Sequence, residues 1–211
     1  MARPKSDIEP RIVEAARAQF LEQGVDGSSL RTIASAAGTS VGMIHYYYPS
    51  KDDLFLAVVE QPYVGLLADL QRALSPDAPV EERLRRLFHR LAALSDDEIS
   101  MVRLVAREVL ISSARFGRLF ARFERGHIPL FLRLLQDGLS ERAFDERRSP
   151  AAIVVAILAL AGPAQFIRRV ASERGLLPGP ADGATAAGEL LDVLLHGIAA
   201  PPSSKRDGGR R

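Results

Sequence analysis

The chain has 211 residues, with 28 Lys and Arg against 26 Asp and Glu, and its sequence contains no Cys. The formal net charge of +2 is too small to indicate a polyanionic partner by charge alone. A sequence without Cys excludes a disulfide scaffold, a Cys nucleophile and thiolate metal ligands, and it fits a reducing cytoplasm. The length allows one or two domains with a sizeable hydrophobic core.

Apolar residues recur at helical spacing in the first 75 residues, and no run alternates as a strand does. Three short helices are expected, ending near Gly24, Gly38 and Pro49. A longer fourth helix is expected from Ser50, with acidic residues in its first turn, and Pro62 is expected to kink or break it. The N-terminal part is therefore predicted to be a cluster of small helices.

Longer helices are expected beyond residue 75, so that the chain is predicted to be all-α with about nine helices. Ser95 and Glu98 have the spacing of a capping box at the start of one of them. The helix from Ala151 is apolar on all sides. Its run Ala151–Ile167 is interrupted by Gly162-Pro163 and, at 17 residues, is shorter than the ~20 that span a bilayer. A buried or interface helix is expected there, and no membrane partner.

The segment from Ser28 to Lys51 has the spacing of a helix-turn-helix motif, with two short helices around a Gly-containing turn. In such a motif the second helix enters the major groove of DNA and the first crosses the backbone. The segment contains no Asp or Glu, and it supplies hydroxyl, His and Tyr side chains. Gly38 suits a turn with positive φ. Gly42 costs a helix ~1 kcal/mol relative to Ala, which indicates a close approach of DNA or of a neighbouring helix.

Many positions of this segment follow one pattern in register, together with Phe20 and Gly24 of the first helix: Ile33-Ala34, Ala37-Gly38-Thr39-Ser40, Gly42, Ile44, Tyr47-Tyr48, Ser50-Lys51 and Leu54. The pattern resembles that of the TetR family of bacterial regulators. The resemblance implies an N-terminal three-helix DNA-binding domain and a C-terminal helical bundle for ligand binding and dimerisation. On this basis the DNA-binding domain is expected over residues 1–50, the C-terminal domain over 51–200, and a disordered tail over 201–211.

The residues expected to contact DNA follow from the register and the resemblance. Ser28 or Ser29 is expected to cap the second helix, and Lys51 to bind a phosphate. Val41 and Met43 are expected to face outward, where their apolar tips can touch a thymine methyl group. Taken singly, such residues are also ordinary caps or surface residues. The full predicted set is Ser28, Ser29, Arg31, Thr39, Ser40, Val41, Gly42, Met43, His45, Tyr46 and Lys51.

The resemblance also implies a homodimer that reads a palindromic operator in double-stranded DNA. The apolar helix from Ala151 and the last helix are expected to form the interface, the alternative being that both are core within one chain. The predicted interface residues are Ile153, Ile157, Leu160, Leu190, Leu194 and Ile198.

A row of aromatic residues with a few polar anchors is expected to line a pocket for a small-molecule effector, the alternative being plain core. The predicted pocket residues are Arg107, Phe116, Phe120, Phe123, His127, Gln165, Phe166 and Arg169.

The predicted function is that of a cytoplasmic, TetR-type transcriptional repressor that a small-molecule effector releases from DNA. A transcriptional activator or dual regulator of the same fold is the alternative. An enzyme is not expected, because the sequence lacks a His-Glu-x-x-His motif, a Gly-rich phosphate loop and the paired Glu-x-x-His motifs of di-iron bundles. No cofactor or metal is therefore expected. A membrane-surface or adaptor bundle would need a strongly basic amphipathic helix, and Glu81 and Glu82 dilute the basic character of residues 84–90.

Overall fold

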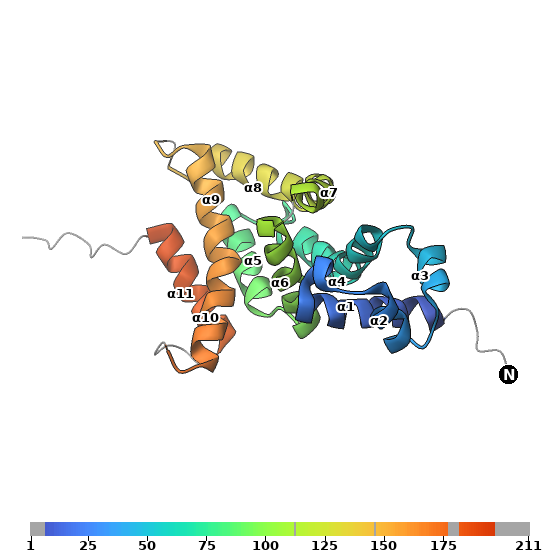
Figure 1. The fold of residues 1–211 in the computed structure, drawn as a ribbon. Coiled ribbons are helices and arrows are strands. Elements are labelled where there is room, and N and C mark those ends of the chain that lie inside the picture. Colours follow the sequence, from blue (N-terminus) through green and yellow to red (C-terminus); the bar gives the residue numbers. More distant parts are fainter. Residues whose placement is uncertain (1–6, 112, 146, 177–181, 197–211) are drawn as a thin grey trace, which may run out of the picture.

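The computed structural model describes residues 7–111, 113–145, 147–176 and 182–196. Every regular element in these ranges is a helix, which confirms the predicted all-α class (Figure 1). The helices are α1 (Ile8–Gly27), α2 (Leu30–Ala36), α3 (Val41–Tyr47), α4 (Lys51–Ala73), α5 (Val80–Ala92), α6 (Asp96–Ile111), α7 (Ser113–Glu124), α8 (Ile128–Ser140), α9 (Pro150–Ala161), α10 (Pro163–Glu173) and α11 (Gly183–His196). The predicted tail over 201–211 lies outside the described residues.

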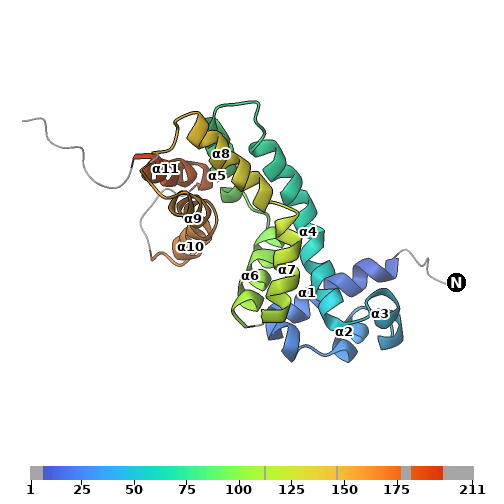
Figure 2. The ribbon, with the colours of Figure 1, turned by 90° about the horizontal axis from the view of Figure 1, so that it is seen from above.

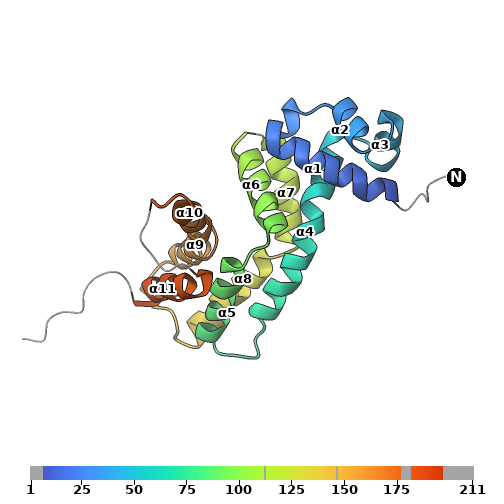
Figure 3. The ribbon, with the colours of Figure 1, turned by 90° about the horizontal axis from the view of Figure 1, so that it is seen from below.

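Helices α1, α2 and α3 lie at one end of the molecule, and α9, α10 and α11 lie at the other (Figure 1). Helix α4 runs from the N-terminal helices toward α5 and so connects the two ends (Figures 2 and 3). Helices α6 and α7 lie along α4 and reach the end of α1. This arrangement leaves α2 and α3 at the tip of the molecule.

Two of the expected helices are each divided in two. The aromatic-rich helix ends at Glu124, and α8 begins after a turn with Pro129 in its first positions. The apolar helix ends at Ala161, because Gly162 has non-helical backbone angles and Pro163 opens α10. Proline lacks an N–H and is tolerated at the first helical positions, which explains both divisions. Pro62, by contrast, does not end its helix, since α4 continues to Ala73.

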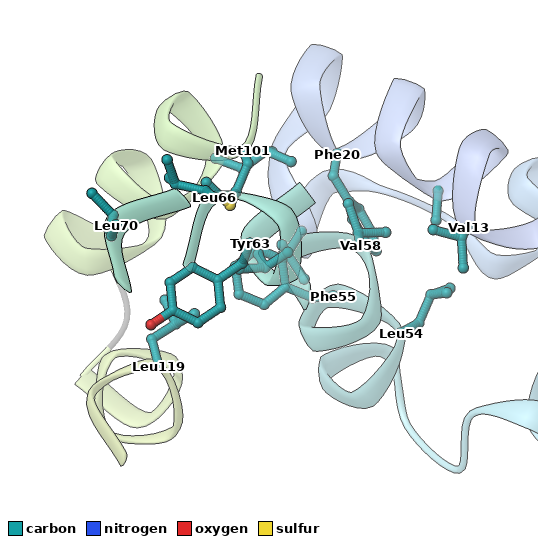
Figure 4. Packing of buried hydrophobic residues seen from close by; sticks show 14 of the residues in the cluster. Val13, Phe20, Leu54, Phe55, Val58, Tyr63, Leu66, Leu70, Met101 and Leu119 are labelled. Atoms are coloured by element: carbon teal, nitrogen blue, oxygen red, sulfur yellow. The ribbon is translucent and has the colours of Figure 1, made fainter. Parts of the chain in front are cut away.

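Helix α4 carries the centre of the hydrophobic core (Figure 4). Phe55 packs edge-to-face against Phe20 of α1, with ring centroids 6.2 Å apart. Farther along α4, Tyr63 and Leu66 are buried near Leu119 of α7 and other core side chains. Burying each large apolar side chain contributes about 1.5–3 kcal/mol. The core therefore extends without interruption from the N-terminal helices to α7.

Capping boxes begin α4 and α6. The box at α6 confirms the prediction for Ser95 and Glu98, and the box at α4 adds to the predicted helix start at Ser50. Asp53 N donates to Ser50 Oγ, and Ser50 N donates to the Asp53 carboxylate, both at 3.1 Å. At α6, Ser95 N donates to Glu98 Oε2 at 2.8 Å, and Glu98 N donates to Ser95 Oγ at 3.3 Å. These reciprocal bonds satisfy backbone donors that the first turn of a helix leaves free.

Candidate nucleic-acid interface

Helices α2 and α3 form the predicted helix-turn-helix. Ser29 caps α2 by accepting a hydrogen bond from Arg31 N at 3.2 Å. Gly38, with φ of 61°, makes the turn, and this left-handed conformation favours glycine. Ser40 caps α3 by accepting from Met43 N at 3.2 Å. The order of cap, helix, glycine turn, cap and helix therefore agrees with the interpretation of the sequence.

The face of α3 that is turned away from the protein carries most of the predicted DNA-contacting side chains. Ile44 is buried and fixes the orientation of the helix. Tyr46 is 74% exposed. Of the other predicted positions, Ser40, Gly42 and His45 are exposed, and Thr39, Val41 and Met43 are half-buried, with Val41 packed against the hydrophobic core.

Tyr48, by contrast, turns inward. It is buried, and its hydroxyl donates to Glu9 Oε1 at 3.2 Å. Burial, followed by the nearby Glu9 carboxylate, raises the pKa of Tyr48 to about 12. Tyr48 therefore stays protonated and attaches the end of α3 to α1.

Gly42 has open space where a side chain would begin. A Cβ atom there would meet only Ser40 Oγ, at 3.7 Å, which is an ordinary contact. A collision with a neighbouring helix of the chain therefore does not explain this glycine. The remaining explanation of its cost to the helix is the close approach of an external partner to α3.

The residues Gly38 to Gly42 also have the Gly-x-Ser-x-Gly spacing of a hydrolase nucleophile elbow. That elbow requires a strand before the serine and a helix after it. Here α2 precedes the turn, and Ser40 Oγ accepts the capping bond from Met43 N. The structural context is thus that of a helix cap, and Ser40 is not placed as a nucleophile.

Ser28 lies inside the protein, which corrects one of the predicted DNA contacts. Its side chain is buried at 5% exposure, and its Oγ lies 2.6 Å from Gly24 O and 3.0 Å from Gln19 O. A serine whose hydroxyl is bound to buried carbonyl groups does not reach a duplex. Of the two candidate caps, Ser29 caps α2 and is exposed.

Lys51, the first residue of α4, holds the end of α1 in place by hydrogen bonds. Its Nζ donates to Asp26 O at 3.2 Å and to Ser28 O at 3.1 Å. These carbonyl groups belong to the last turn and the C-cap of α1, where the helix dipole attracts a positive charge. The Lys51 ammonium group thus has a structural role in addition to the phosphate contact that the sequence predicts.

Arg115 of α7 neutralises the two acids that flank the acid-free segment. Its Nη2 donates to Asp26 Oδ2 at 2.6 Å, and its Nη1 donates to Asp52 Oδ1 at 3.2 Å. Its Nε donates to the buried Glu108 at 2.6 Å. Hydrogen bonding to Arg115 holds the pKa of Asp26 below its usual range. Sequence reasoning missed Arg115, because it is 89 residues from Asp26 and no local motif marks it.

Comparison with known proteins agrees with this geometry. The sequence model of bacterial regulatory proteins of the tetR family matches residues 12–58, which span most of α1, all of α2 and α3, and the start of α4. The helix-turn-helix part of the chain, residues 12–58, is that of the TetR family. The chain is a TetR-type transcriptional regulator with a DNA-binding helix-turn-helix.

Two relatives of this chain are named as transcriptional regulators. YttP of Bacillus subtilis (strain 168), a probable HTH-type transcriptional regulator, is 26% identical over 66% of this chain and 69% of its own. CecR of Shigella flexneri, an HTH-type transcriptional dual regulator, is 29% identical over 50% of this chain and 53% of its own. The chain thus spans about half the length of CecR. The structure of PfmR, a TetR family regulator from Thermus thermophilus, matches with a TM-score of 0.67 and 22% identity, covering 90% of this chain and all of that one.

The residues predicted to line an effector pocket do not share one cavity in this TetR-family structure. Phe116 and Phe120 lie on the outer face of α7, where both are exposed, and Leu119 is buried instead. Arg107 donates to Gln23 O at 3.2 Å, beside the end of α1. These three predicted residues therefore lie apart from the interior of the bundle.

The other predicted pocket residues occupy two separate places. Phe123 and His127 do pack together, with ring centroids 4.9 Å apart, and His127 also lies near Phe131. Gln165 is buried in α10, where Phe166 is half-buried, and Arg169 donates to Leu94 O and Asp96. None of the eight predicted residues lines any of the three cavities described below.

The regulator has a hollow elsewhere in its C-terminal helices. Its volume is about 470 Å³, and its lining comes from the loop before α9, from α9 and from the end of α11, including Phe144, Ile153, Ile157, Arg148 and His196. Two smaller cavities, of about 290 Å³ and 320 Å³, are lined by residues of α1, α4, the start of α6 and the segments that flank α4 and α6.

The predicted dimer residues of the regulator face their own chain more than expected. Ile157 is buried, and Ile153 and Leu194 line the hollow. Leu160 and Leu190 are half-buried, and Ile198 lies outside the described residues. The apolar side chains that α9 and α10 leave uncovered are instead Val155, Leu158 and Ile167.

The span Pro150–Ser172, which α9 and α10 form, contains an 18-residue window with a mean hydropathy of 2.0, of which only 17% is buried. At 23 residues it is long and apolar enough to cross a membrane by length and composition. This span of 23 residues is longer than the apolar run of 17 residues from Ala151 to Ile167. A large part of its surface is exposed in the single chain.

Proposed function

We propose that this regulator is a homodimeric repressor that binds a palindromic operator through α3 and leaves it when a small-molecule effector binds. The observation that carries the proposal is the exposed face of α3 around Gly42 and Tyr46, in a segment without Asp or Glu. An α-helix fits the major groove of B-DNA, and a face without carboxylates avoids repulsion by the phosphates.

Contacts to phosphate and contacts to bases are expected from different residues. Ser29 and Arg31 lie at the N-terminus of α2, where free backbone N–H groups and a guanidinium group suit a phosphate. Tyr46 and Lys51 extend the phosphate contacts on either side of the motif. Phosphate contacts fix the position of the protein on the duplex and do not read its sequence.

Base contacts are expected from the first turns of α3. Val41 and Met43 present apolar side chains that suit the methyl group of thymine. Thr39 and Ser40 supply hydroxyl groups, and the exposed His45 supplies a ring nitrogen, so each can bond a base edge. The operator preference is therefore expected to depend on these five residues.

The uncovered apolar face of α9 and α10 supports a dimer. Val155, Leu158 and Ile167 are exposed apolar side chains on helices that otherwise pack against α11 and α5. A two-fold interface needs such a self-complementary apolar surface. Two protomers related in this way would place their α3 helices about 34–36 Å apart, the spacing of successive major grooves.

Release by an effector requires that the C-terminal helices control the position of the helix-turn-helix. Arg115 of α7 connects to Asp26 and Asp52, and Glu108 Oε1 lies 3.4 Å from Val25 N. A ligand that shifts α6 and α7 would thus move α1 and the start of α4. Such a shift changes the separation of the two α3 helices and weakens binding to the operator.

Repression follows when the dimer occupies a promoter and blocks polymerase. Activation or dual regulation, as the name of the relative CecR states for that protein, depends on where the operator lies. The same function places the regulator in the cytoplasm, where the DNA of a bacterium is.

The proposal is tested by selecting DNA from a pool of random duplexes with the purified full chain. The expected result is enrichment of a palindrome with two half-sites about one helical turn apart, protected from cleavage as a unit. Transcription from a promoter that contains this operator should fall when the regulator is added. Failure to enrich any sequence, or enrichment of single half-sites only, would contradict the proposal.

A further inference from the structure

The guanidinium group of Arg83 lies inside the C-terminal bundle and is incompletely paired. Arg83 is near the start of α5 and is 1% exposed. Its Nη1 donates to Oδ2 of Asp137 in α8 at 2.7 Å. Its Nε and Nη2 are buried and have no hydrogen-bond partner among the described residues. Buried polar groups in proteins are as a rule hydrogen-bonded, so these two free donors need an explanation.

The two free atoms lie on one edge of the planar guanidinium group. Nε–H and Nη2–H point to the same side, and this edge binds two oxygen atoms of a carboxylate or a phosphate at once. Asp137 binds Nη1 and leaves the edge open. Arginine is preferred over lysine where such bidentate recognition is needed. The open edge of Arg83 therefore has the geometry of an oxyanion site.

Other free donors lie on the same group of helices. Nη1 of Arg90 and Nε2 of Gln165 are also buried without a partner among the described residues. Arg83 and Arg90 lie on the same side of α5, being two helical turns apart, and Gln165 belongs to α10, which contacts α5. The corresponding acceptor without a partner, Gln19 Oε1, lies in α1. The described part of the C-terminal bundle thus has unpaired buried donors and suits a ligand rich in acceptors.

The hollow of about 470 Å³ is lined by α9, α11 and the segment before α9, and both helices contact α5, which carries Arg83. Phe144 lines the hollow, and its ring fills the space where a Cβ of Gly138 would lie. Gly138 follows Asp137, the partner of Arg83, directly in the chain. The apolar part of the lining includes Ile153 and Ile157. The volume lies in the range of small-molecule sites, which is about 300–1,000 Å³.

We infer that Arg83 binds the oxyanion group of an amphipathic effector, a carboxylate or phosphate whose apolar chain lies in the hollow beside Phe144. The inference rests on the proposed regulation by an effector and specifies the chemistry of that effector. Because Arg83 is closed to solvent, the ligand enters through the hollow and displaces the Phe144 ring. The apolar lining of the hollow excludes water from the apolar chain of the effector. The guanidinium edge of Arg83 selects the charged head group of the effector.

The test measures binding of three probes to the full chain without DNA. The probes are decanoate, decyl phosphate and decan-1-ol, which share one apolar chain and differ in the head group. Titration calorimetry and the shift of the thermal midpoint should show binding of decanoate or decyl phosphate, and none of decan-1-ol. Comparison of the two anions identifies the preferred head group.

Variants assign the binding to Arg83. R83M keeps the volume of the side chain and leaves Asp137, which is partly exposed, to solvent, so the bundle is expected to fold. It should weaken binding of the preferred anion by at least about tenfold. R83K keeps the positive charge but lacks the planar guanidinium group, so it should also weaken binding of the preferred anion. The matched control is R85M, since Arg85 lies on the exposed side of α5 and pairs with Glu81 and Glu82. R85M should bind like the wild type.

Two results would overturn the inference. One is that neither anion binds the wild-type chain at 1 mM, which would mean that the free edge of Arg83 is filled by water only. The other is that a folded R83M or R83K binds both anions as tightly as the wild type. Neither result depends on DNA, so the operator selection described above stands or fails separately from this test.

Discussion

Nη2 of Arg115 in α7 lies 2.6 Å from Oδ2 of Asp26, in the last turn of α1. This ion pair joins the bundle to the loop that leads into the helix-turn-helix. Arg115 also binds Glu108, which is 2% exposed, and Asp52 near the start of α4. The ends of α1, α4 and α6 are thus attached to one guanidinium group.

Replacement of Arg115 by Met should lower the free energy of unfolding by about 3 kcal/mol, because Glu108 would remain as a buried and unpaired carboxylate. Urea denaturation measures this loss. The matched control is Arg118→Met, since Arg118 pairs with Asp53 at an exposed site, and its loss should cost less than about 1 kcal/mol. Equal effects of the two substitutions would show that the Arg115 cluster adds nothing beyond a surface pair.

Lys51→Met should weaken binding to every duplex alike and lower the slope of log affinity against log salt by about one unit per protomer. The ammonium group also donates to the carbonyl groups of Asp26 and Ser28, and Lys51→Met removes both hydrogen bonds. The same substitution should therefore cost about 1 kcal/mol of stability. An unchanged salt slope would remove Lys51 from the phosphate contacts and leave its structural role.

The pH dependence of stability should include a contribution from His127. Burial, followed by the nearby Arg122 charge, lowers the pKa of His127. Its Nδ1 lies 3.0 Å from the hydroxyl of Tyr63, whose oxygen accepts a bond from His127 N at 3.3 Å. When the ring is neutral, Nδ1 can accept the hydroxyl proton of Tyr63, and burial favours this uncharged form.

As pH falls below about 6.5, the unfolded chain takes up a proton at His127 before the folded chain does. The free energy of unfolding is thus unaffected above that pH and decreases as the pH falls toward the lowered pKa. His127→Gln removes this titration, so the difference in stability between wild type and variant should be smaller at pH 5.5 than at pH 7.5. Urea denaturation at both values measures it. A constant difference would mean that the pKa of His127 is not lowered.

Val155→Asp should convert the dimer into monomers, because Val155 is 64% exposed on the apolar face of α9. Light scattering coupled to size-exclusion chromatography measures the molar mass. The control is Leu132→Asp, which places the same charge at an exposed apolar position of α8. If the wild-type chain is a monomer, or if it requires detergent or lipid to remain in solution, the face of α9 and α10 has another partner.

The sequence predicts the helix-turn-helix well because its signals are local. Ser29, Gly38 and Ser40 each act on the backbone within a few residues, so spacing alone is enough to place them. The capping boxes of α4 and α6 are predictable for the same reason. Ser28 is the exception, since its neighbour Ser29 has the same side chain and only the fold shows which of the two is buried.

The pocket could not be predicted in the same way. Helix α7 carries apolar side chains on more than one side, and spacing alone does not show which side faces inward. The structure buries Leu119 and leaves Phe116 and Phe120 exposed. The orientation agrees with the position of Arg115, one turn from Leu119, which pairs with acids that are far away in the sequence. Such long-range pairs decide the orientation and leave no local pattern.

The most direct test of the central proposal compares the affinity of variants for the selected operator. Replacement of both His45 and Tyr46 by Ala removes two exposed side chains of α3, so the thermal midpoint should stay within about 2 °C of the wild type. The affinity should fall by at least about tenfold, because each contact is lost twice in a dimer. Phe120→Ala, an exposed aromatic side chain on α7, should bind like the wild type. If the double variant binds the operator as tightly as the wild type, the exposed face of α3 is not the surface that holds DNA.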